Sequence, residues 1–569
     1  MQTDKTGLTE ADGTGTSASA ALDEPGGPGG LGGPGKIAVG ITRGAALIAG
    51  LTAISRVFGL IRTLVFAQSV GAGCLGTAYV TANQVPNLIY ELAVGGALTS
   101  AMVPVLARSA ARSAADPEEK QRVSQITSAL LTWCVVILLP LTVLIMAAAG
   151  PIAGLLIPAN PNAACARPAM ISATSTMVVI FAPQILLYGI SVVLSGLLQA
   201  YRRFTGPTLA PVIANFVMIG SYLAFAALDN GHSLAGTPVA AELVLAIGTT
   251  MNIGMLVIVA LPPALRLRLQ LRPTFAFPAG VTGRVGGLAL VGVLEFLAGD
   301  VASVITIDLA NGHGDTGALV LVNYAALVFN SVTAVLALSI VTSAFPALVA
   351  TDDAALNRMC AGSTRALLLM SWLGTAVIAA VAVPAAHILV KQSSQVSQLT
   401  EAFILYAPAV AGLALIANAA RVMFALGRLK IAAAGLVGGQ LLGALISVPL
   451  VLYAPPRLTV AAVSLGATIG QLTVAVPLML ALRRIRGRSA VQGVGRATLA
   501  SVLAGVAGGV VGLSVTLVTP TNGKIEDLGS GALAAVAAVL VFGVVAYALD
   551  SSDLRMVAGR LRRFTRSRA

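Results

Sequence analysis

Residues 55–62 read Ser55-Arg56-Val57-Phe58-Gly59-Leu60-Ile61-Arg62, and they lie inside a long apolar stretch over residues 40–70. About 20 apolar residues suffice for a helix to cross the ~30 Å hydrocarbon core of a bilayer, so the stretch predicts a membrane-spanning helix. An arginine near the bilayer centre costs at least about 2.5–3.5 kcal/mol. We therefore expect both arginines to face a wet cavity or a compensating partner.

The two arginines do not share one narrow helix face, because six residues at about 100° each place them about 120° apart. Gly59 between them would ease a bend, or the cavity is wide. A guanidinium binds phosphate through two parallel hydrogen bonds, which suits a diphosphate. We predict that Arg56 and Arg62 contact substrate. The alternatives are extension to the membrane interface or a structural pair with one of three acids, Glu91, Glu295 and Asp300.

The rest of the chain has the composition of a membrane protein. Of its 569 residues, 57% are hydrophobic and 10% are charged, whereas soluble domains have about 45–50% apolar and about 25% charged residues. So little charge leaves too little polar surface for a water-soluble globule. The net charge of +13 is a feature of nucleic-acid-binding proteins, but here the basic residues lie at the ends of apolar runs, which excludes nucleic acid as a partner.

Long apolar stretches alternate with short polar joints from Ile37 onward. The fold class predicted is an all-α polytopic membrane protein with about fourteen transmembrane helices, each long enough to cross the bilayer. The predicted spans are 40–70, 76–107, 123–149, 169–201, 206–228, 238–262, 283–310, 317–350, 359–390, 402–427, 430–453, 459–482, 497–519 and 530–549.

The distribution of basic residues predicts the orientation. With the N-terminus inside, 28 of the 35 lysines and arginines fall in cytoplasmic segments, and four, Arg167, Lys391, Arg457 and Lys524, fall outside. This bias follows the positive-inside rule. We therefore expect a multi-pass protein of the bacterial plasma (inner) membrane with both termini in the cytoplasm. Residues 1–36, rich in Gly and Pro, are expected to be a disordered tail, and residues 551–569 a basic tail.

Polar residues interrupt two further spans. The second span carries Asn83, Pro86, Asn87 and Glu91. Proline removes a backbone donor, and such a break survives in a membrane where it lines protein or water. We predict that Asn83, Asn87 and Glu91 line a substrate cavity, with a plain packing kink as the alternative.

The seventh span carries Glu295, Asp300 and Asp308, of which Asp308 is expected near the outer interface. Glu295 and Asp300 either balance the arginines, bind a cation or take up protons, and we assign them a coupling or charge-balancing role. Arg421, in the tenth span, is expected to extend to the membrane interface.

Signatures of catalysis and of cofactor binding are missing from the sequence. There is no Walker loop for ATP, and His232, His313 and His387 lack metal-ligand spacing. We expect no catalytic residue, no metal and no resident cofactor. Cys74 and Cys165 are both predicted to lie outside, but they are far apart in sequence, so a disulfide between them is not expected.

The residues above resemble those of the MurJ (MviN) lipid II flippase family of the MOP exporter superfamily. The stretches that carry the resemblance are 55–62, Gly71-Ala-Gly73, Pro86-Asn-Leu88, Gly96 to Leu106, Arg203 to Gly220 and Arg421 to Gly427. The resemblance covers the chain from about residue 40 to about residue 550, with matching span order.

The resemblance implies fourteen helices that form two six-helix lobes around a central cavity, with two extra C-terminal helices beside a lipid-facing groove. The corresponding segments are an N-lobe over 37–265, a C-lobe over 266–490 and the last two helices over 491–550. It also implies alternating-access transport of lipid II, with Arg56 and Arg62 matching cavity arginines of the family. Membrane lipids and cell-wall synthesis proteins are the further partners implied.

Three positions depart from the family pattern. The family's acid early in the second span falls on Thr77, its paired arginines fall on Tyr90 and Glu91, and its eighth-span arginine falls near Leu327. The cavity is therefore less basic than the family pattern. Alternative functions are export of another polyprenyl-diphosphate glycan, cation-coupled efflux, and a non-transporting cell-wall scaffold. The driving force would be the membrane potential or a monovalent ion.

Overall fold

The structure, a computed structural model, describes most of the chain from residue 51 onward, and Leu51–Ala569 forms one compact unit. The described residues are 51, 54–91, 106, 109–110, 112–113, 116–160, 164–229, 236–278, 286–338, 353–519 and 523–566. The predicted disordered tail, residues 1–36, lies outside them.

Helices make up the regular structure of the described residues. A helix over 54–69 comes first. It is followed by α2 (Cys74–Tyr90), α4 (Pro117–Ala147), α5 (Ala149–Leu156), α6 (Arg167–Phe181), α7 (Pro183–Ala200), α8 (Thr205–Asp229), α9 (Val239–Leu265), α10 (Gly286–His313) and α11 (Ala318–Val332), which a π-helical turn extends to Leu338. Next come α13 (Asp353–Ala380), α14 (Ala382–Leu389), α15 (Ser393–Tyr406), α16 (Ala409–Ala425), α17 (Leu429–Tyr453), α18 (Thr459–Arg486), α19 (Val494–Val518) and α20 (Lys524–Arg566).

Eleven segments of the described residues are long and apolar enough to cross a membrane. They coincide with predicted spans three to six and eight to fourteen, so the all-α polytopic fold class is confirmed. The seventh predicted span overlaps α10, and the first, second, seventh and eighth predicted spans all extend into residues outside the described part. Two of the eleven segments, 167–200 and 393–425, each consist of two helices. One break lies at Ala182, just before Pro183, and the other lies at Ala407 and Pro408, as expected near a residue without a backbone N–H.

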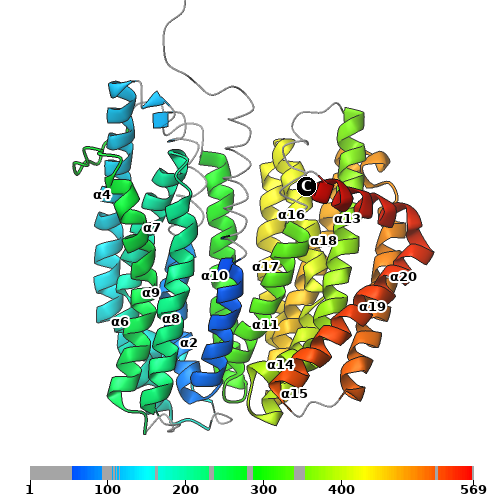
Figure 1. The fold of residues 1–569 in the computed structure, drawn as a ribbon, viewed down its shortest axis with the longest axis horizontal. Coiled ribbons are helices and arrows are strands. Elements are labelled where there is room, and N and C mark those ends of the chain that lie inside the picture. The colour runs from blue at the N-terminus through cyan, green and yellow to red at the C-terminus, as the bar shows by residue number, and fades with distance from the viewer. Residues whose placement is uncertain are drawn as a thin grey trace, which may run out of the picture. The chain divides into compact units, whose positions relative to one another are not determined.

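The helices form two groups (Figure 1), and small residues bring helices close together within each group. In the first group, α2 packs on α6, α7 on α4 and α9, and α8 on α9. Gly248 of α9 lies directly against Ser221 of α8. In the second group, α10, α16 and α18 pack on α17, α11 and α15 pack on α18, and α13 packs on α16. The backbones of Gly443 and Gly470 touch where α17 crosses α18, as is common for small residues in membrane helices.

The last two helices form a hairpin that packs on α13 and α14. Gly508 and Gly512 of α19 bring its backbone against Ala538 of α20. Helix α20 bends at Asp550, whose φ is −149°. Beyond the bend, Asp553 pairs with Arg365 of α13 at 3.2 Å. Burial raises the pKa of the Asp553 carboxyl, and the charge of Arg365 opposes that rise.

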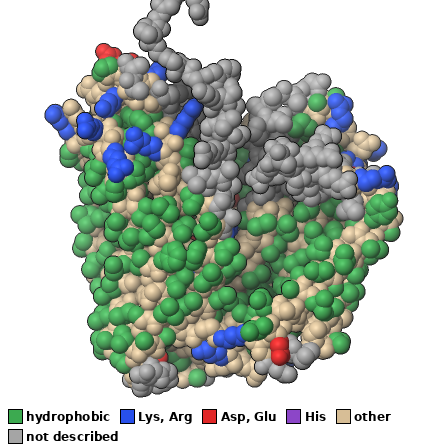
Figure 2. All heavy atoms as spheres, viewed as in Figure 1, with side chains coloured by type: hydrophobic (Ala, Val, Ile, Leu, Met, Phe, Trp, Pro, Cys, Tyr) green, Lys and Arg blue, Asp and Glu red, His purple; other side chains and the backbone are tan. Residues whose placement is uncertain are grey.

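The helix ends define two opposite ends of the compact unit. One end, here the basic end, holds the start of α4 and the ends of α7, α9 and α18 with their arginines; the other, the disulfide end, holds the starts of α2, α6, α11 and α15. Apolar side chains cover much of the surface between the ends in Figure 2, and lysines and arginines gather mostly at the end drawn at the top. This distribution is the one that a bilayer requires.

Candidate functional site

The helix over 54–69 lies against α2 and α8 through aromatic contacts. The rings of Phe58 and Phe216 are 4.4 Å apart, and the ring of Phe66 lies 5.3 Å from Tyr79 and 5.2 Å from Tyr222. The amide of Asn215 also donates to the carbonyl of Ser55 at 3.5 Å. The arginine-bearing helix is therefore part of the first helix group.

The two predicted site arginines differ in their exposure. Arg56 is exposed and Arg62 is half-buried. The charge of Arg62 is close enough to act on the hydroxyl groups of Tyr79, Tyr188 and Tyr222. Neither arginine forms an ion pair with a carboxylate among the described residues. The predicted structural pair with Glu91, Glu295 or Asp300 is thus not formed in this conformation.

Tyr79, Tyr188 and Tyr222 lie within electrostatic range of Arg62 and form what we call the tyrosine cluster. The hydroxyl groups of Tyr79 and Tyr222 are 3.1 Å apart, and that of Tyr79 is 2.9 Å from Oγ1 of Thr249. Both tyrosines are buried, and a buried phenol needs such partners for its O–H group. This cluster was not among the residues predicted from the sequence, although tyrosines inside apolar spans were a usable signal.

The predicted residues of α2 reach different surroundings. The hydroxyl of Tyr188 donates to Oδ1 of Asn87 at 3.2 Å, and the rings of Tyr188 and Tyr90 are 4.3 Å apart. Asn83 is half-buried, and Glu91 is exposed just after the end of α2. Helix α2 continues through Pro86 to Tyr90. The substrate-binding roles of these residues stay predictions.

Glu295 and Asp300 of α10 interact with different charges. Glu295 lies within electrostatic range of Arg421 on α16, and Asp300 lies within range of Glu91. Asp300 is 8% exposed, and its Oδ1 has no hydrogen-bond partner among the described residues. Nη1 of Arg421 is likewise buried and unpartnered there. Arg421 is thus half-buried in the second helix group, within electrostatic range of Glu295.

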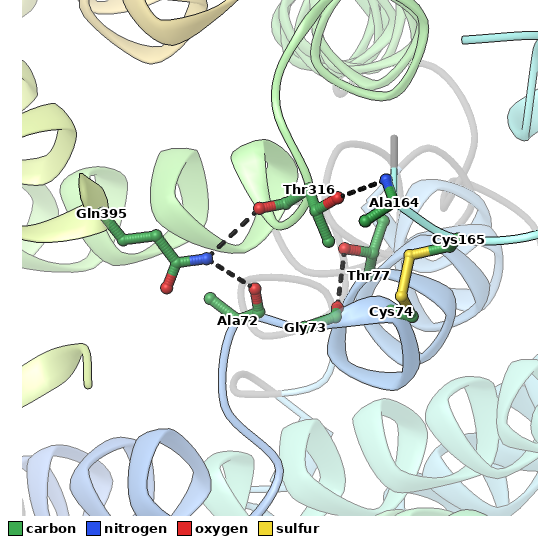
Figure 3. The surroundings of a disulfide bond; sticks show 8 residues. All are labelled: Ala72, Gly73, Cys74, Thr77, Ala164, Cys165, Thr316 and Gln395. Carbon is green, nitrogen blue, oxygen red and sulfur yellow. Dashed lines mark hydrogen bonds between the residues drawn. A yellow bond between two sulfur atoms is a disulfide. The ribbon is translucent and has the colours of Figure 1, made fainter. Parts of the chain in front are cut away.

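The structure corrects the prediction for the cysteines: Cys74 and Cys165 form a disulfide, drawn in Figure 3. Cys74 begins α2 and Cys165 lies just before α6, and these two helices pack together with their N-termini at the same end. The sequence separation of 91 between the cysteines is irrelevant once the helices are assembled, because the intervening spans return the chain to the same end. Sequence separation was the wrong criterion.

Hydrogen bonds at the disulfide end join the two helix groups; we call their side chains Asn160, Asn311, Thr316 and Gln395 the gate cluster. Asn160 donates to the carbonyls of Asn311 and Gly314, both at 2.8 Å. Gln395 donates to the carbonyls of Ala72 at 2.8 Å and Thr316 at 3.2 Å. The N–H of Ala164, next to the disulfide, donates to Oγ1 of Thr316 (Figure 3). The disulfide therefore lies next to the hydrogen bonds that join the two helix groups at this end.

A second set of contacts ties the end of the helix over 54–69 to the C-terminal half. Nε2 of Gln68 donates to the carbonyl of Ile388 at 2.8 Å. Nζ of Lys391 donates to the carbonyl of Gln68 at 2.6 Å, and Nζ of Lys524 donates to its Oε1 at 2.7 Å. The arginine-bearing helix is thus hydrogen-bonded to the C-terminal half at the disulfide end.

The disulfide predicts the number of reactive thiols. Cys134 and Cys360 are free, so denatured but unreduced protein should take up two maleimide–polyethylene glycol groups, and reduced protein four. The mass shift on a gel measures this directly. Cys74→Ser with Cys165→Ser should give two in both samples, and four groups on unreduced wild-type protein would contradict the disulfide.

Comparisons with known proteins identify relatives of this architecture. The profile of a family described as lipid II flippase MurJ matches residues 66–526. A probable lipid II flippase MurJ of Rhizobium meliloti is 31% identical over 205 residues, which are 35% of this chain and 37% of the relative. The lipid II flippase MurJ of Burkholderia cenocepacia is 28% identical over 179 residues, 32% of this chain and 33% of the relative. These alignments span well under two thirds of either relative.

Solved structures show the same fold. A lipid II flippase MurJ in an inward closed conformation matches with a TM-score of 0.67 at 16% identity, over 88% of this chain and 99% of that chain. An inward-facing MATE family multidrug transporter of the MOP superfamily matches with a TM-score of 0.61 at 12% identity, over 76% of this chain and 95% of the transporter. At these identities the likeness concerns the fold alone.

Proposed function

Because this chain belongs to the MurJ lipid II flippase family, we propose that it carries lipid II across the membrane by alternating access. The observation that carries the proposal is the placement of Arg62, which is half-buried, lies near three tyrosine hydroxyls and has no carboxylate partner among the described residues. A cation held in this way is available to an anionic ligand. The diphosphate of a lipid-linked glycan is such a ligand, and guanidinium matches its geometry.

The proposed site residues divide by their surroundings. Arg62 binds the diphosphate beside the tyrosine cluster, and the exposed Arg56 meets the substrate earlier on its way in. Asn83, Asn87 and Glu91 line the path from α2. Asn87 already accepts a hydrogen bond from Tyr188, so a change at Tyr188 would alter its orientation.

Movement in this proposal uses the two helix groups as lobes, residues 37–265 and 266–490, with 491–550 as the bordering helices. The gate cluster supports a state closed at the disulfide end. Glu295 and Asp300 are proposed to couple that movement to a monovalent ion or to the membrane potential. Their electrostatic links to Arg421 and Glu91 join α10 to α16 and α2.

We propose that the basic end faces the cytoplasm and that the disulfide end faces outward. The basic residues of the described loops support this orientation. The disulfide supports it independently, because disulfides persist in oxidising compartments outside the cytoplasm. Both chain termini would then be cytoplasmic.

Site-directed labelling tests the orientation. A single cysteine placed at position 560 in a background lacking native cysteines should react with an impermeant maleimide only after the cells are permeabilised. A cysteine at Lys524, at the disulfide end, should react in intact cells and serves as the matched control. Labelling of position 560 in intact cells would refute the orientation.

Depletion of the protein tests the function. Loss of an essential flippase should leave lipid II inaccessible to an externally added enzyme that cleaves its exposed headgroup, while total lipid II rises. Unchanged lipid II accessibility, with another polyprenyl-diphosphate glycan retained inside, would instead identify export of that glycan. No retained lipid-linked glycan of any kind would favour the efflux or scaffold functions.

A further inference from the structure

A cavity of about 210 Å³ lies within the second helix group, apart from Arg62. Helices α10, α11, α17 and α18 supply most of its wall. Its polar lining side chains are Gln84, Ser303, Thr306, Asn323, Tyr406, Gln440, Ser447, Ser464 and Gln471. All of them are uncharged, and no carboxylate or basic side chain is among the described residues that line it. We call it the neutral cavity.

Glycines keep the cavity open to its polar side chains. Gly299, Gly439 and Gly443 line it beside the amides of Gln440 and Gln471. A Cβ placed on Gly439 would lie 2.8 Å from Oε1 of Gln471, and one on Gly299 would lie 3.7 Å from Nε2 of Gln440. A side chain at Gly439 would therefore displace the Gln471 amide.

Gln471 is the polar group that most needs a ligand. Its side chain is 9% exposed, and its Oε1 is buried without a hydrogen-bond partner among the described residues. A buried acceptor left without a partner destabilises a protein by about 1–3 kcal/mol. Such a group persists where it serves a ligand that supplies the missing donor.

The neutral cavity also contacts the first helix group. Nε2 of Gln84 on α2 donates to Oδ1 of Asn323 on α11 at 3.3 Å, and both side chains line the cavity. Helix α2 also carries Asn87 and ends beside Glu91. Helix α2 thus contributes one residue to the wall of the neutral cavity and carries other residues of the proposed diphosphate path.

We propose that the neutral cavity binds the uncharged part of the substrate headgroup, a sugar or peptide portion rich in amide and hydroxyl groups; this rests on the proposed function. An N–H or O–H of that portion donates to Oε1 of Gln471, while Arg62 binds the diphosphate. Amide and hydroxyl side chains recognise such groups by hydrogen bonds, and a wall without formal charge favours a neutral ligand over a phosphate. Charge recognition and glycan recognition are therefore divided between the two helix groups.

Binding of two different ligands tests the two proposed recognition sites independently. The full chain in lipid nanodiscs is titrated with lipid II and with undecaprenyl diphosphate, which has the same lipid and diphosphate but no glycan. Gln471→Met, of similar volume, should weaken lipid II binding about threefold to tenfold, as expected for one or two neutral hydrogen bonds. It should leave the affinity for undecaprenyl diphosphate unchanged. Arg62→Ala should weaken the binding of both ligands.

Adjacent glycines supply a matched pair of variants. Gly439→Ala should reproduce the effect of Gln471→Met, because its new Cβ meets Oε1 of Gln471. Gly438→Ala adds the same methyl group one residue earlier, where the nearest atoms are Cγ atoms of Val474 at 3.6 and 3.7 Å, and it should bind both ligands normally. Gln471→Met should also not lower the melting temperature of the free protein, since it removes an unpaired acceptor.

Each other outcome overturns the proposal. Equal weakening of both ligands by Gln471→Met, with a lower melting temperature, would show a structural role. Unchanged lipid II binding would show that the cavity does not take the headgroup, and a change only in the sodium dependence of binding would show a cation site instead. If the wild-type protein binds both ligands equally tightly, glycan recognition is refuted but the proposed function is not. If the wild-type protein binds neither ligand, the proposed function is refuted as well.

Discussion

Arg62→Ala should reduce lipid II translocation about tenfold to a hundredfold or more, while the protein still inserts and accumulates. A hydrogen bond to a charged group contributes about 1.5–3 kcal/mol, and Arg62 has no carboxylate partner among the described residues that its removal would leave unpaired. The loss should therefore fall on substrate binding and not on folding. Translocation is measured in proteoliposomes, with membrane levels followed by immunoblot.

Conservative and neighbouring variants make the result specific. Arg62→Lys should restore part of the activity, because the charge remains and the two-pronged geometry does not. Arg56→Ala should have the smaller effect, since Arg56 is exposed. Rescue of Arg62→Ala by neutralising Glu91, Glu295 or Asp300 would instead indicate a structural ion pair. Full activity of Arg56→Ala and Arg62→Ala at normal levels would refute the diphosphate site.

Gly317→Ala should prevent closure of the disulfide end and reduce translocation at least tenfold. Gly317 precedes α11 with a φ of +90°, where a side chain costs roughly 1–2 kcal/mol. A Cβ at this position would also overlap the backbone carbonyl of Ala72. Since about 1.4 kcal/mol changes a population tenfold, the closed state should become at least tenfold rarer.

The accessibility of Thr81 reports this change directly. Thr81 is fully buried and accepts a hydrogen bond at 3.1 Å from Asn311, a member of the gate cluster. A cysteine at Thr81 should react with an external impermeant reagent at least tenfold faster when Gly317→Ala is present. Gly73→Ala, which adds its methyl group near the same end with no heavy atom within 4 Å, should leave the rate unchanged.

A second variant tests the same opening in case Gly317→Ala misfolds. Gln395→Leu removes the hydrogen bonds to Ala72 and Thr316 without backbone strain, and it should speed labelling of Thr81Cys to a smaller degree. Slow labelling with normal translocation in both variants would show that these contacts do not control the gate.

Local chemistry along the chain determined the membrane fold. Apolar runs of more than about 20 residues have no stable alternative to crossing a bilayer as helices, so predicted spans three to six and eight to fourteen coincide with those of the structure. Lysines and arginines gather in every second loop between the spans, and this bias can also be read from the sequence alone. Arg62 was identified as a site candidate because a charge inside such a run is expensive wherever its neighbours lie.

Tertiary structure alone decided which side chains meet. The pairing of Cys74 with Cys165, the approach of the tyrosine cluster to Arg62 and the link from Glu295 to Arg421 each join different spans, so no local pattern encodes them. Arg56 and Arg62 lie in the same apolar stretch, so the sequence could not show that one is exposed and the other half-buried. Side chains inside a membrane are sorted by how helices pack on one another, and that packing depends on small residues such as Gly443 and Gly470, whose close approach becomes visible only when both helices are in place.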